Sequence, residues 1–405
     1  MRHCKTILNL PRTPCWAIVS RQIQGNTRMP ETKTVAIVKC SAYSAGVEGA
    51  TERLLAQLGG MKSFVAAGQS VLIKPNLLTD RTPAQAVTTH PEVVRAIIRL
   101  VRSAGGEPMV GDSPASVTRL DTLWDKTGMR KVCEEEKTPL LNFEKEGSRL
   151  FDIDGLSVGI ARAVLDADVV INVPKVKTHV LTTLTGAVKN MYGAVPGFQK
   201  TYLHKMRPNP TDFGRLLAGI HDRIPPALSI ADGIVGMEGS GPSGGKPVEL
   251  GFLAASEDSY ALDATLCRIL GIRVSAVSYM DGYLKRRTPH GAAGEIRLSG
   301  VGPDDIAPRS FEAPHSLARL IPGWLAHPLG KLVWMRPFFT DRCVSCGRCV
   351  EACPVSAISM RKNHPPVLNP RACIECCCCH EICPEAAIRM TPSPFLKLIQ
   401  RGRQP

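Results

Sequence analysis

The chain has 405 residues, of which 44% are hydrophobic and 21% are charged, and its formal net charge is +14. Domains average about 150 residues, so this length predicts two or three of them, and the composition is typical of a globular protein with a real core. No segment reaches the roughly 18 consecutive apolar residues of a membrane-spanning helix, so we do not expect a transmembrane protein.

The positive charge does not indicate nucleic-acid binding. No run of Lys and Arg exceeds three residues, and no aromatic residues are interleaved with basic ones as on an RNA-binding surface. We therefore expect the charge to serve a small anionic molecule or an acidic redox partner protein.

Residues 1–33 are expected to form a basic, disordered extension. Pro11 and Pro14 interrupt its apolar residues, so it is a poor signal peptide. Translation begins either at Met1 or at Met29, which lies just before the first predicted strand.

Residues 34–312 alternate short β-branched runs with amphipathic stretches. Strands are predicted at 35–38, 71–73, 108–110, 169–173, 228–230 and 246–255, and helices at 48–58, from Pro91 to a stop at Gly105-Gly106, and at 260–270. This alternation predicts an α/β domain with a mostly parallel, doubly wound sheet. The chain contains neither GxGxxG nor GxxxxGK[ST], so neither a Rossmann dinucleotide site nor a P-loop is predicted.

Polar residues follow four of these strands. They are Lys74 and Asn76 after 71–73, Asp112 after 108–110, Lys175, Lys177 and His179 after 169–173, and Asp232 after 228–230. Open α/β sheets bind ligands outside the carboxyl ends of their strands, so we expect these residues to form one site. Taken singly, each has a simpler explanation as a turn residue or a solvated side chain.

Thr185 and Lys189 extend this predicted site. Residues 182–190 begin a predicted helix, whose free N–H groups and hydroxyls suit a phosphate or a carboxylate. The loop at 236–245 contains five glycines and is either a mobile cover or a backbone cradle for the ligand.

Residues 313–340 carry aromatic side chains such as Trp324 and Trp334 among basic residues and prolines. One interpretation is an amphipathic segment on a membrane surface. The interpretation we favour is a linker that docks a C-terminal domain on the α/β domain and ends at Thr340.

Two cysteine runs occupy residues 341–392. The first is Cys343-x2-Cys346-x2-Cys349-x3-Cys353-Pro, and the second repeats it 30 residues later with Cys373, Cys376, Cys379 and Cys383. This is the spacing of two-cluster bacterial ferredoxins, in which the fourth cysteine of each run ligates the other cluster. We assign one [4Fe-4S] cluster to Cys343, Cys346, Cys349 and Cys383, and the other to Cys373, Cys376, Cys379 and Cys353. Zinc sites and disulfides are the alternatives, but the in-register repeat with both prolines disfavours them.

Residues 341–392 are therefore expected to form a small α+β ferredoxin-like domain, followed by a tail at 393–405. The cysteines outside this domain are scattered without disulfide-like spacing. Free thiols and clusters both indicate a reducing, cytoplasmic location.

Several segments resemble the DUF362 family, a domain of unassigned function that is often fused to a two-cluster ferredoxin. They are VLIKPNLL (71–78), VGDSP (110–114), NVPKVKTH (172–179), TGAVKNMYGAVPG (185–197), the Asp232-Gly233 turn and Cys378-Cys379-His380-Glu381. The resemblance implies an iron–sulfur protein with an α/β ligand-binding domain, and it supplies no substrate. The chain departs from the pattern in having four consecutive cysteines at 376–379, with Cys377 where the first run has Gly347. The extra thiols, Cys377 and Cys378, are alternative ligands, oxidation-prone groups or buried bystanders.

We expect a cytoplasmic oxidoreductase that passes electrons from the ferredoxin domain to a small anionic substrate. Lys175, Lys177 and Lys189 would hold the anion. His179 would donate a proton, and Asp112 or Asp232 would orient either His179 or the substrate. One-electron clusters usually work with a two-electron partner such as a flavin, but the chain has no flavin motif. The alternative is a non-enzymatic electron-transfer or metallocentre-maturation protein whose α/β domain docks a partner protein.

Overall fold

The computed structural model describes residues 32–44, 46–115, 118–286, 295–306, 308, 310–314 and 334–395. The predicted extension up to residue 31, most of the predicted linker (315–333, with Trp324) and the tail from residue 396 lie outside the described residues. Within the described part, no helix is both long and apolar enough to cross a membrane.

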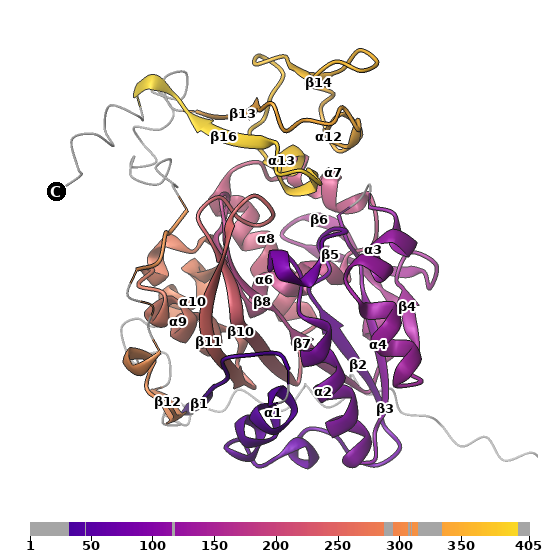
Figure 1. Ribbon diagram of the computed structural model, residues 1–405, viewed down its shortest axis with the longest axis vertical. Helices are drawn as coiled ribbons and strands as arrows, with labels where there is room; N and C mark the ends of the chain where they lie inside the picture. The colour runs from indigo at the N-terminus through magenta and orange to yellow at the C-terminus, as the bar shows by residue number, and fades with distance from the viewer. Residues whose placement is uncertain are drawn as a thin grey trace, which may run out of the picture.

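A ten-stranded sheet forms the centre of the molecule (Figure 1). Eight of its strands follow one another in the order β12 (Ile296–Gly300), β1 (Lys33–Lys39), β11 (Lys246–Ser256), β10 (Leu228–Glu238), β7 (Val169–Val173), β2 (Ser70–Pro75), β3 (Glu107–Asp112) and β4 (Leu140–Asn142). The other two strands branch from this path: β8 (Lys175–His179) pairs with β10, and β9 (Thr183–Thr185) pairs with β8. Most neighbours run parallel, and β11 is the main exception, because it lies antiparallel between β1 and β10. The predicted mostly parallel α/β sheet is confirmed.

Helices cover both faces of this sheet and create two separate cores. One core lies under α1 (Val47–Ala56), α2 (Pro91–Ser103) and α4 (Met129–Glu135), and the other under α8 (Pro210–Arg223) and α9 (Ser259–Ile269). Successive strand residues point to opposite faces. Accordingly, Ala36 of β1 belongs to the first core and its neighbours Val35 and Ile37 belong to the second.

The predicted strands and the helices predicted at 48–58, from Pro91 and at 260–270 are present. The helix predicted to begin over residues 182–190 is limited to α6 (Ala187–Asn190), because residues 183–185 form strand β9. Helix α2 begins as expected, with Pro91 in its first turn and the His90 side chain accepting a hydrogen bond from the Glu92 N–H at 3.2 Å. The elements that were not predicted are β4, β8, β9, β12, the hairpin of β5 (Ser148–Ile153) and β6 (Leu156–Ala161), and helices α3 (Leu120–Lys126), α4, α5 (Arg162–Leu165), α7 (Gln199–Met206), α8 and α10 (Asp281–Arg286). Short 3-10 helices lie at Met61–Ser63, Pro83–Gln85, Met191–Ala194, Val274–Ala276, Ser278–Met280 and Pro303–Asp305.

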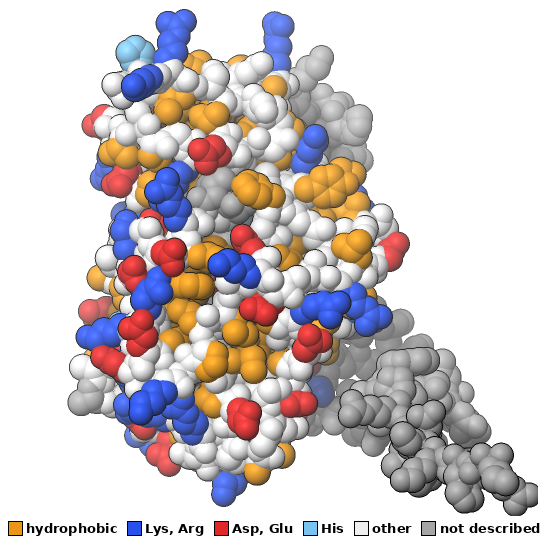
Figure 2. All heavy atoms as spheres, turned by 90° about the vertical axis from the view of Figure 1, so that its right-hand side faces the viewer, with side chains coloured by type: hydrophobic (Ala, Val, Ile, Leu, Met, Phe, Trp, Pro, Cys, Tyr) orange, Lys and Arg blue, Asp and Glu red, His pale blue; other side chains and the backbone are white. Residues whose placement is uncertain are grey.

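The C-terminal domain lies over the carboxyl ends of the central strands of the sheet, and α13 faces the α/β domain (Figure 1). It contains α12 (Arg348–Glu351) and α13 (Cys378–Ile382), the strand pair β13 (Met335–Phe339) and β16 (Ile388–Pro392), and the pair β14 (Ile358–Ser359) and β15 (Val367–Leu368). On the side view of Figure 2, basic and acidic side chains are intermixed over both domains.

The backbone of this domain repeats at the same interval as its cysteines. Positive φ angles occur at Ser345 and Glu375, at Gly347 and Cys377, and at Ser356 and Ala386. Cys377 adopts φ 64° at the start of α13, where the first run has Gly347 with φ 79°. A non-glycine residue in this region is strained, so the tight turn before the helix is retained at an energetic cost.

Asp263 of α9 holds the start of α6 and offers a test of this fold. Its buried carboxylate accepts hydrogen bonds from the N–H groups of Ala187 at 2.7 Å and Val188 at 3.1 Å, and burial raises the pKa of Asp263 to about 7. We expect Asp263→Ala to lower the free energy of unfolding by about 2–4 kcal/mol, because two buried donors lose their acceptor. Denaturation followed by circular dichroism measures this. Asp304 is exposed, so Asp304→Ala is the control and should change the free energy of unfolding by less than about 0.5 kcal/mol. Equal effects of Asp263→Ala and Asp304→Ala would show that Asp263 does not stabilise the start of α6.

A candidate ligand cavity between two domains

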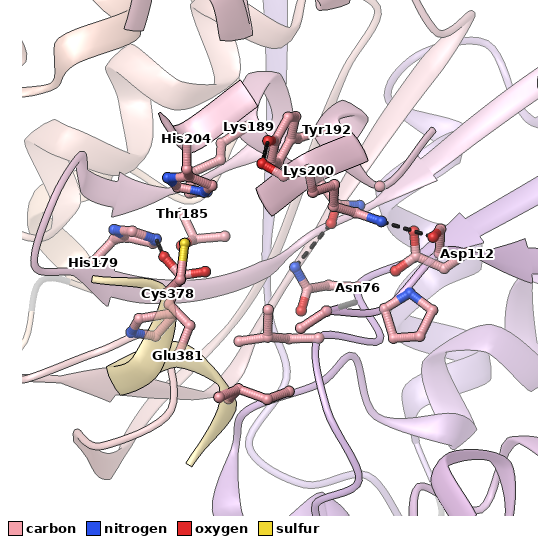
Figure 3. Close-up of a pocket in the computed structure, with 18 of the residues that line it drawn as sticks. Asn76, Asp112, His179, Thr185, Lys189, Tyr192, Lys200, His204, Cys378 and Glu381 are labelled. Carbon is pink, nitrogen blue, oxygen red and sulfur yellow. Dashed lines mark hydrogen bonds and ion pairs between the residues drawn. The ribbon is translucent and has the colours of Figure 1, made fainter. Parts of the chain in front are cut away.

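A cavity with an empty volume of about 740 Å³, part of which is open to solvent, lies between the α/β domain and the C-terminal domain. The α/β side consists of the carboxyl ends of β2 and β3, strands β8 and β9, helix α6 and helix α7. The opposite wall comes from α13 and from Ala352 at the end of α12. The cavity is therefore complete only when the two domains are in contact (Figure 3).

Strand β8 directs Lys175, Lys177 and His179 to one side, because alternate residues of a strand share a face. Lys177 lines the cavity and donates hydrogen bonds to Asn76 Oδ1 at 3.0 Å and to the Val87 carbonyl at 2.5 Å. Burial, reinforced by the nearby Lys189 ammonium, lowers the pKa of Lys177 to about 7.

Two further predicted lysines are buried in ion pairs behind the cavity. Lys175 Nζ lies 2.9 Å from Asp232 Oδ2 and 2.8 Å from the Tyr43 hydroxyl, and neither Lys175 nor Asp232 is among the lining residues. Lys74 Nζ lies 2.7 Å from Asp112 Oδ1, while the other oxygen of Asp112 accepts the Leu77 N–H at 2.8 Å. Of these four residues, Asp112 alone reaches the cavity, so the two ion pairs chiefly hold the strand ends in place.

The predicted anion-binding segment lies in the wall of the cavity. Lys189 of α6 is 8% exposed, and among the described residues no hydrogen bond or ion pair reaches its ammonium. The rings of Tyr192 and Phe213 lie 5.5 and 5.6 Å from Lys189 Nζ. The buried Thr185 hydroxyl also has no hydrogen-bond partner within the described chain. Both groups line the cavity and are free to bind a ligand.

Helix α7 adds two basic residues that the sequence interpretation did not include. Lys200 and His204 are four residues apart, hence on one side of the helix, and both line the cavity. Lys200 Nζ donates to Ser113 Oγ at 2.7 Å, and burial lowers the pKa of Lys200 to about 7. His204 stacks on Phe213 at 4.1 Å, and burial lowers the pKa of its imidazole to about 4. The i, i+4 spacing of these two residues in the sequence was the signal that could have indicated them.

The C-terminal domain contributes Glu381 and Cys378 to the cavity. Glu381 Oε1 lies 3.0 Å from His179 Nε2, and His179 Nδ1 accepts the N–H groups of Leu181 and Thr182. These acceptor contacts assign the ring proton to Nε2, which faces the carboxylate. Burial lowers the pKa of His179 to about 3, so the imidazole is neutral near pH 7 and orients Glu381.

Polar contacts on both sides of the cavity hold the domains together. Arg348 of α12 forms two contacts with the buried Asp80 carboxylate, at 2.5 and 3.2 Å, and Arg81 Nη2 donates to the Cys383 carbonyl at 2.9 Å. The glycine-rich loop is part of this interface. Ser243 Oγ donates to the His380 carbonyl at 3.0 Å, and His380 Nε2 lies 2.9 Å from the Ser240 carbonyl oxygen. The loop therefore contacts the second domain directly, and its Pro242 also lines the ligand cavity.

The cysteines surround two smaller cavities, each with an empty volume of about 340 Å³. The first cluster cavity is lined by Cys343, Cys346, Cys349 and Cys383. The second cluster cavity is lined by Cys353, Cys373, Cys376, Cys377, Cys378 and Cys379. The rest of each lining is mostly apolar, apart from Glu385 in the first and Glu375 in the second. The Ala357 and Ala387 N–H groups donate to Cys353 Sγ and Cys383 Sγ at 3.1 and 3.2 Å. In the described chain, no three His, Cys, Asp or Glu residues are placed to hold a single metal ion. Thiolates around an apolar space, with N–H donors to sulfur, fit a cubane.

Comparison with known proteins identifies both parts of the chain. Residues 337–359 match a 4Fe-4S binding domain, so this is an iron–sulfur protein. Residues 71–268 match the domain of unknown function DUF362. The thylakoid-associated protein sll1697 of Synechocystis sp. is 40% identical over 288 residues, which are 70% of this chain and 89% of that protein. The chain belongs to the DUF362 family, as its motifs indicated.

Among solved structures, the lactate racemase apoprotein from Thermoanaerobacterium thermosaccharolyticum is similar to this chain. The match covers 60% of this chain and 58% of that one, with a TM-score of 0.40 and 16% sequence identity.

The Asp80–Arg348 ion pair should control the docking of the C-terminal domain. Removing one partner of a buried pair costs about 3 kcal/mol or more, so we expect Asp80→Ala to speed release of this domain by limited proteolysis at least tenfold. Mass spectrometry of the released fragment measures the rate. Asp125→Ala, which removes an exposed partner of Arg130, is the control and should leave the rate unchanged. A normal rate for Asp80→Ala would show that other contacts carry the interface.

Proposed function

We propose that this protein binds two [4Fe-4S] clusters and passes electrons to a small anionic ligand in the cavity between its domains. The observation that carries the proposal is the shared wall: α13, which lies within the second cysteine run, closes a cavity that three buried lysines line from the other side. An electron-carrying domain that forms one wall of a binding site is well placed to reduce what binds there.

Eight cysteines would hold the clusters in the crossed arrangement expected from the spacing. One set is Cys343, Cys346, Cys349 and Cys383, and the other is Cys353, Cys373, Cys376 and Cys379. The separate grouping of these residues around two cavities supports this division, because Cys383 lies with the first run and Cys353 with the second. When bound, the clusters supply one-electron transfer.

Lys177, Lys189 and Lys200 would bind the anion. Lys189 and the Thr185 hydroxyl are open to a ligand, whereas Lys177 and Lys200 are already held in place by Asn76 and Ser113. Preorganised charges in a buried site stabilise negative charge that develops during reduction. A lysine whose pKa lies near 7 can also release a proton to the reduced product, which suits Lys177 and Lys200 better than the neutral His179.

A redox partner protein would supply the electrons at the first cysteine set. Cys346 is exposed and the neighbouring Val344 is 62% exposed, so this set is accessible from outside the molecule. In the second set Cys376 and Cys379 are buried, Cys353 and Cys373 are half-buried, and none of the four is fully exposed.

Pairs of cysteine substitutions test the crossed arrangement. Two clusters contain about eight irons per chain. Cys343→Ala combined with Cys383→Ala should reduce this to about four, because both residues serve one cluster. Cys343→Ala combined with Cys353→Ala should remove both clusters. Iron analysis and electron paramagnetic resonance measure the outcome, and Cys377→Ala should retain both clusters. The reverse pattern would show that each run holds its own cluster.

The anion site is tested by reoxidation of the reduced clusters. Visible absorbance of the anaerobically reduced protein is followed while the metabolite fraction of a cell extract is added. We expect reoxidation to be at least tenfold slower in Lys189→Met, because the cavity loses its unpaired cation. Lys205→Met changes an exposed lysine of α7 and should behave as wild type. Reoxidation by the protein fraction alone, insensitive to Lys189→Met, would instead indicate an electron carrier.

The affinity for the anionic acceptor should fall as the pH rises through about 7. The pKa values of Lys177 and Lys200 are lowered to about 7, so both are protonated below this pH and lose their charge above it. Lys177 faces Lys189, Lys175, Glu381 and Asp112, and Lys200 faces Lys74, Asp112 and Glu144. The KM for the acceptor, measured between about pH 6 and 8.5, should rise, and the rise should be smaller in Lys200→Arg because arginine keeps its charge. A KM independent of pH would exclude these lysines from binding.

A further inference from the structure

Cys378 belongs to two cavities at once. It lines the ligand cavity together with Glu381, and it lines the second cluster cavity together with Cys376 and Cys379. In the described chain, the residues that line the first cluster cavity and those that line the ligand cavity have no member in common. The two cysteine sets are therefore not equivalent, and the second set is the neighbour of the ligand.

The second set also lacks an exposed cysteine. Two cysteines of each set are 8% exposed, and Cys353 and Cys373 of the second set are half-buried, whereas Cys346 of the first set is exposed to solvent. Water screens charges strongly and the protein interior screens them weakly, so a charge in the second set acts on the ligand cavity with little attenuation. A charge in the first set is nearer to solvent and acts on it less.

The groups free to bind a ligand lie opposite Cys378. In Figure 3, Cys378 and Glu381 of α13 face Thr185 and His179. The Thr185 hydroxyl and the Lys189 ammonium are both more than nine-tenths buried, and the described residues offer neither of them a hydrogen-bond partner. A ligand that satisfies these two groups therefore lies beside the wall that Cys378 forms.

We propose that anion binding in the cavity is coupled to the charge of the cluster in the second cysteine set and not to that of the first. This inference rests on the proposed function. Reduction adds one negative charge behind the Cys378 wall, so it weakens anion binding. Coupling is reciprocal, so a bound anion lowers the reduction potential of the second cluster by the matching amount. The reduced second cluster thus releases an anionic occupant more readily than the oxidised one does.

Cys378 is the positioning residue of this coupling, because it separates the two cavities. In Cys378→Ala the lost sulfur leaves space next to polar groups, which water can fill. Water between the two sites screens their interaction. Cys377 provides a matched control, since it lines the second cluster cavity but not the ligand cavity.

The experiment measures the reduction potentials of both clusters in the holoprotein with and without oxalate, by redox titration monitored with electron paramagnetic resonance. Dithionite supplies the electrons. Calorimetry measures oxalate binding to the oxidised and the reduced protein. We expect oxalate to lower the potential of the second cluster alone and reduction to weaken oxalate binding about tenfold, within the usual range of allosteric coupling. In Cys378→Ala, which should retain both clusters, the oxalate-induced change in the reduction potential of the second cluster should be at most half of the wild-type change. In Cys377→Ala this change should equal that of the wild type.

The clusters are assigned in variants that keep only one of them, Cys343→Ala/Cys383→Ala and Cys353→Ala/Cys373→Ala. Oxalate could bind to the oxidised protein and change the reduction potential of the first cluster, or of neither cluster. Either result overturns the coupling but leaves the anion site in place. An unchanged shift in Cys378→Ala overturns the role of this residue. If oxalate and inorganic phosphate both fail to bind to the oxidised protein, the proposed anion site itself fails, and the coupling with it.

Discussion

The ligand cavity of this protein depends on which partners compensate the charge of its buried lysines. Burial of an ammonium group is costly unless a partner compensates the charge. Lys74 and Lys175 have carboxylate partners, and Lys177 and Lys200 have neutral oxygen acceptors. Lys189 has two aromatic rings and, among the described residues, no oxygen partner. The ligand cavity is therefore short of negative charge, and an anion is the occupant that would correct this.

The second domain completes the cavity and also limits its charge. Glu381 provides the one carboxylate of this domain that faces the cavity in the described chain, and its contact with the neutral His179 imidazole fixes its direction. Burial alone would raise the pKa of Glu381, but the contact with His179 and the nearby Lys189 ammonium lower the pKa instead. The interface contacts through Arg348, Arg81 and His380 hold α13 against the lysines. The domain thus acts as a structural part of the binding site, in addition to any electron transfer.

The four consecutive cysteines have different structural environments. Cys376 and Cys379 face the second cluster cavity, Cys378 faces this cavity and the ligand cavity, and Cys377 also packs into the core of the α/β domain. Cys377 occupies a strained left-handed position that the first run fills with Gly347. Its side chain lies against the neighbouring domain, where glycine would provide no packing contact. The departure from the repeat thus lies at the domain interface.

The sequence by itself determined the fold class, the strand ends and the family. Apolar periodicity and glycine stops are local signals, and the cysteine spacing predicts cluster binding because thiolate reach depends on a few neighbouring residues. Only the tertiary structure decided which polar residues share a cavity. Lys175 and Lys177 are two residues apart on one strand, yet Asp232 on β10 pairs with the first and leaves the second at the cavity. Cys378 and Glu381 join it from the C-terminal domain. Such placement depends on long-range packing between two domains, which no local pattern records.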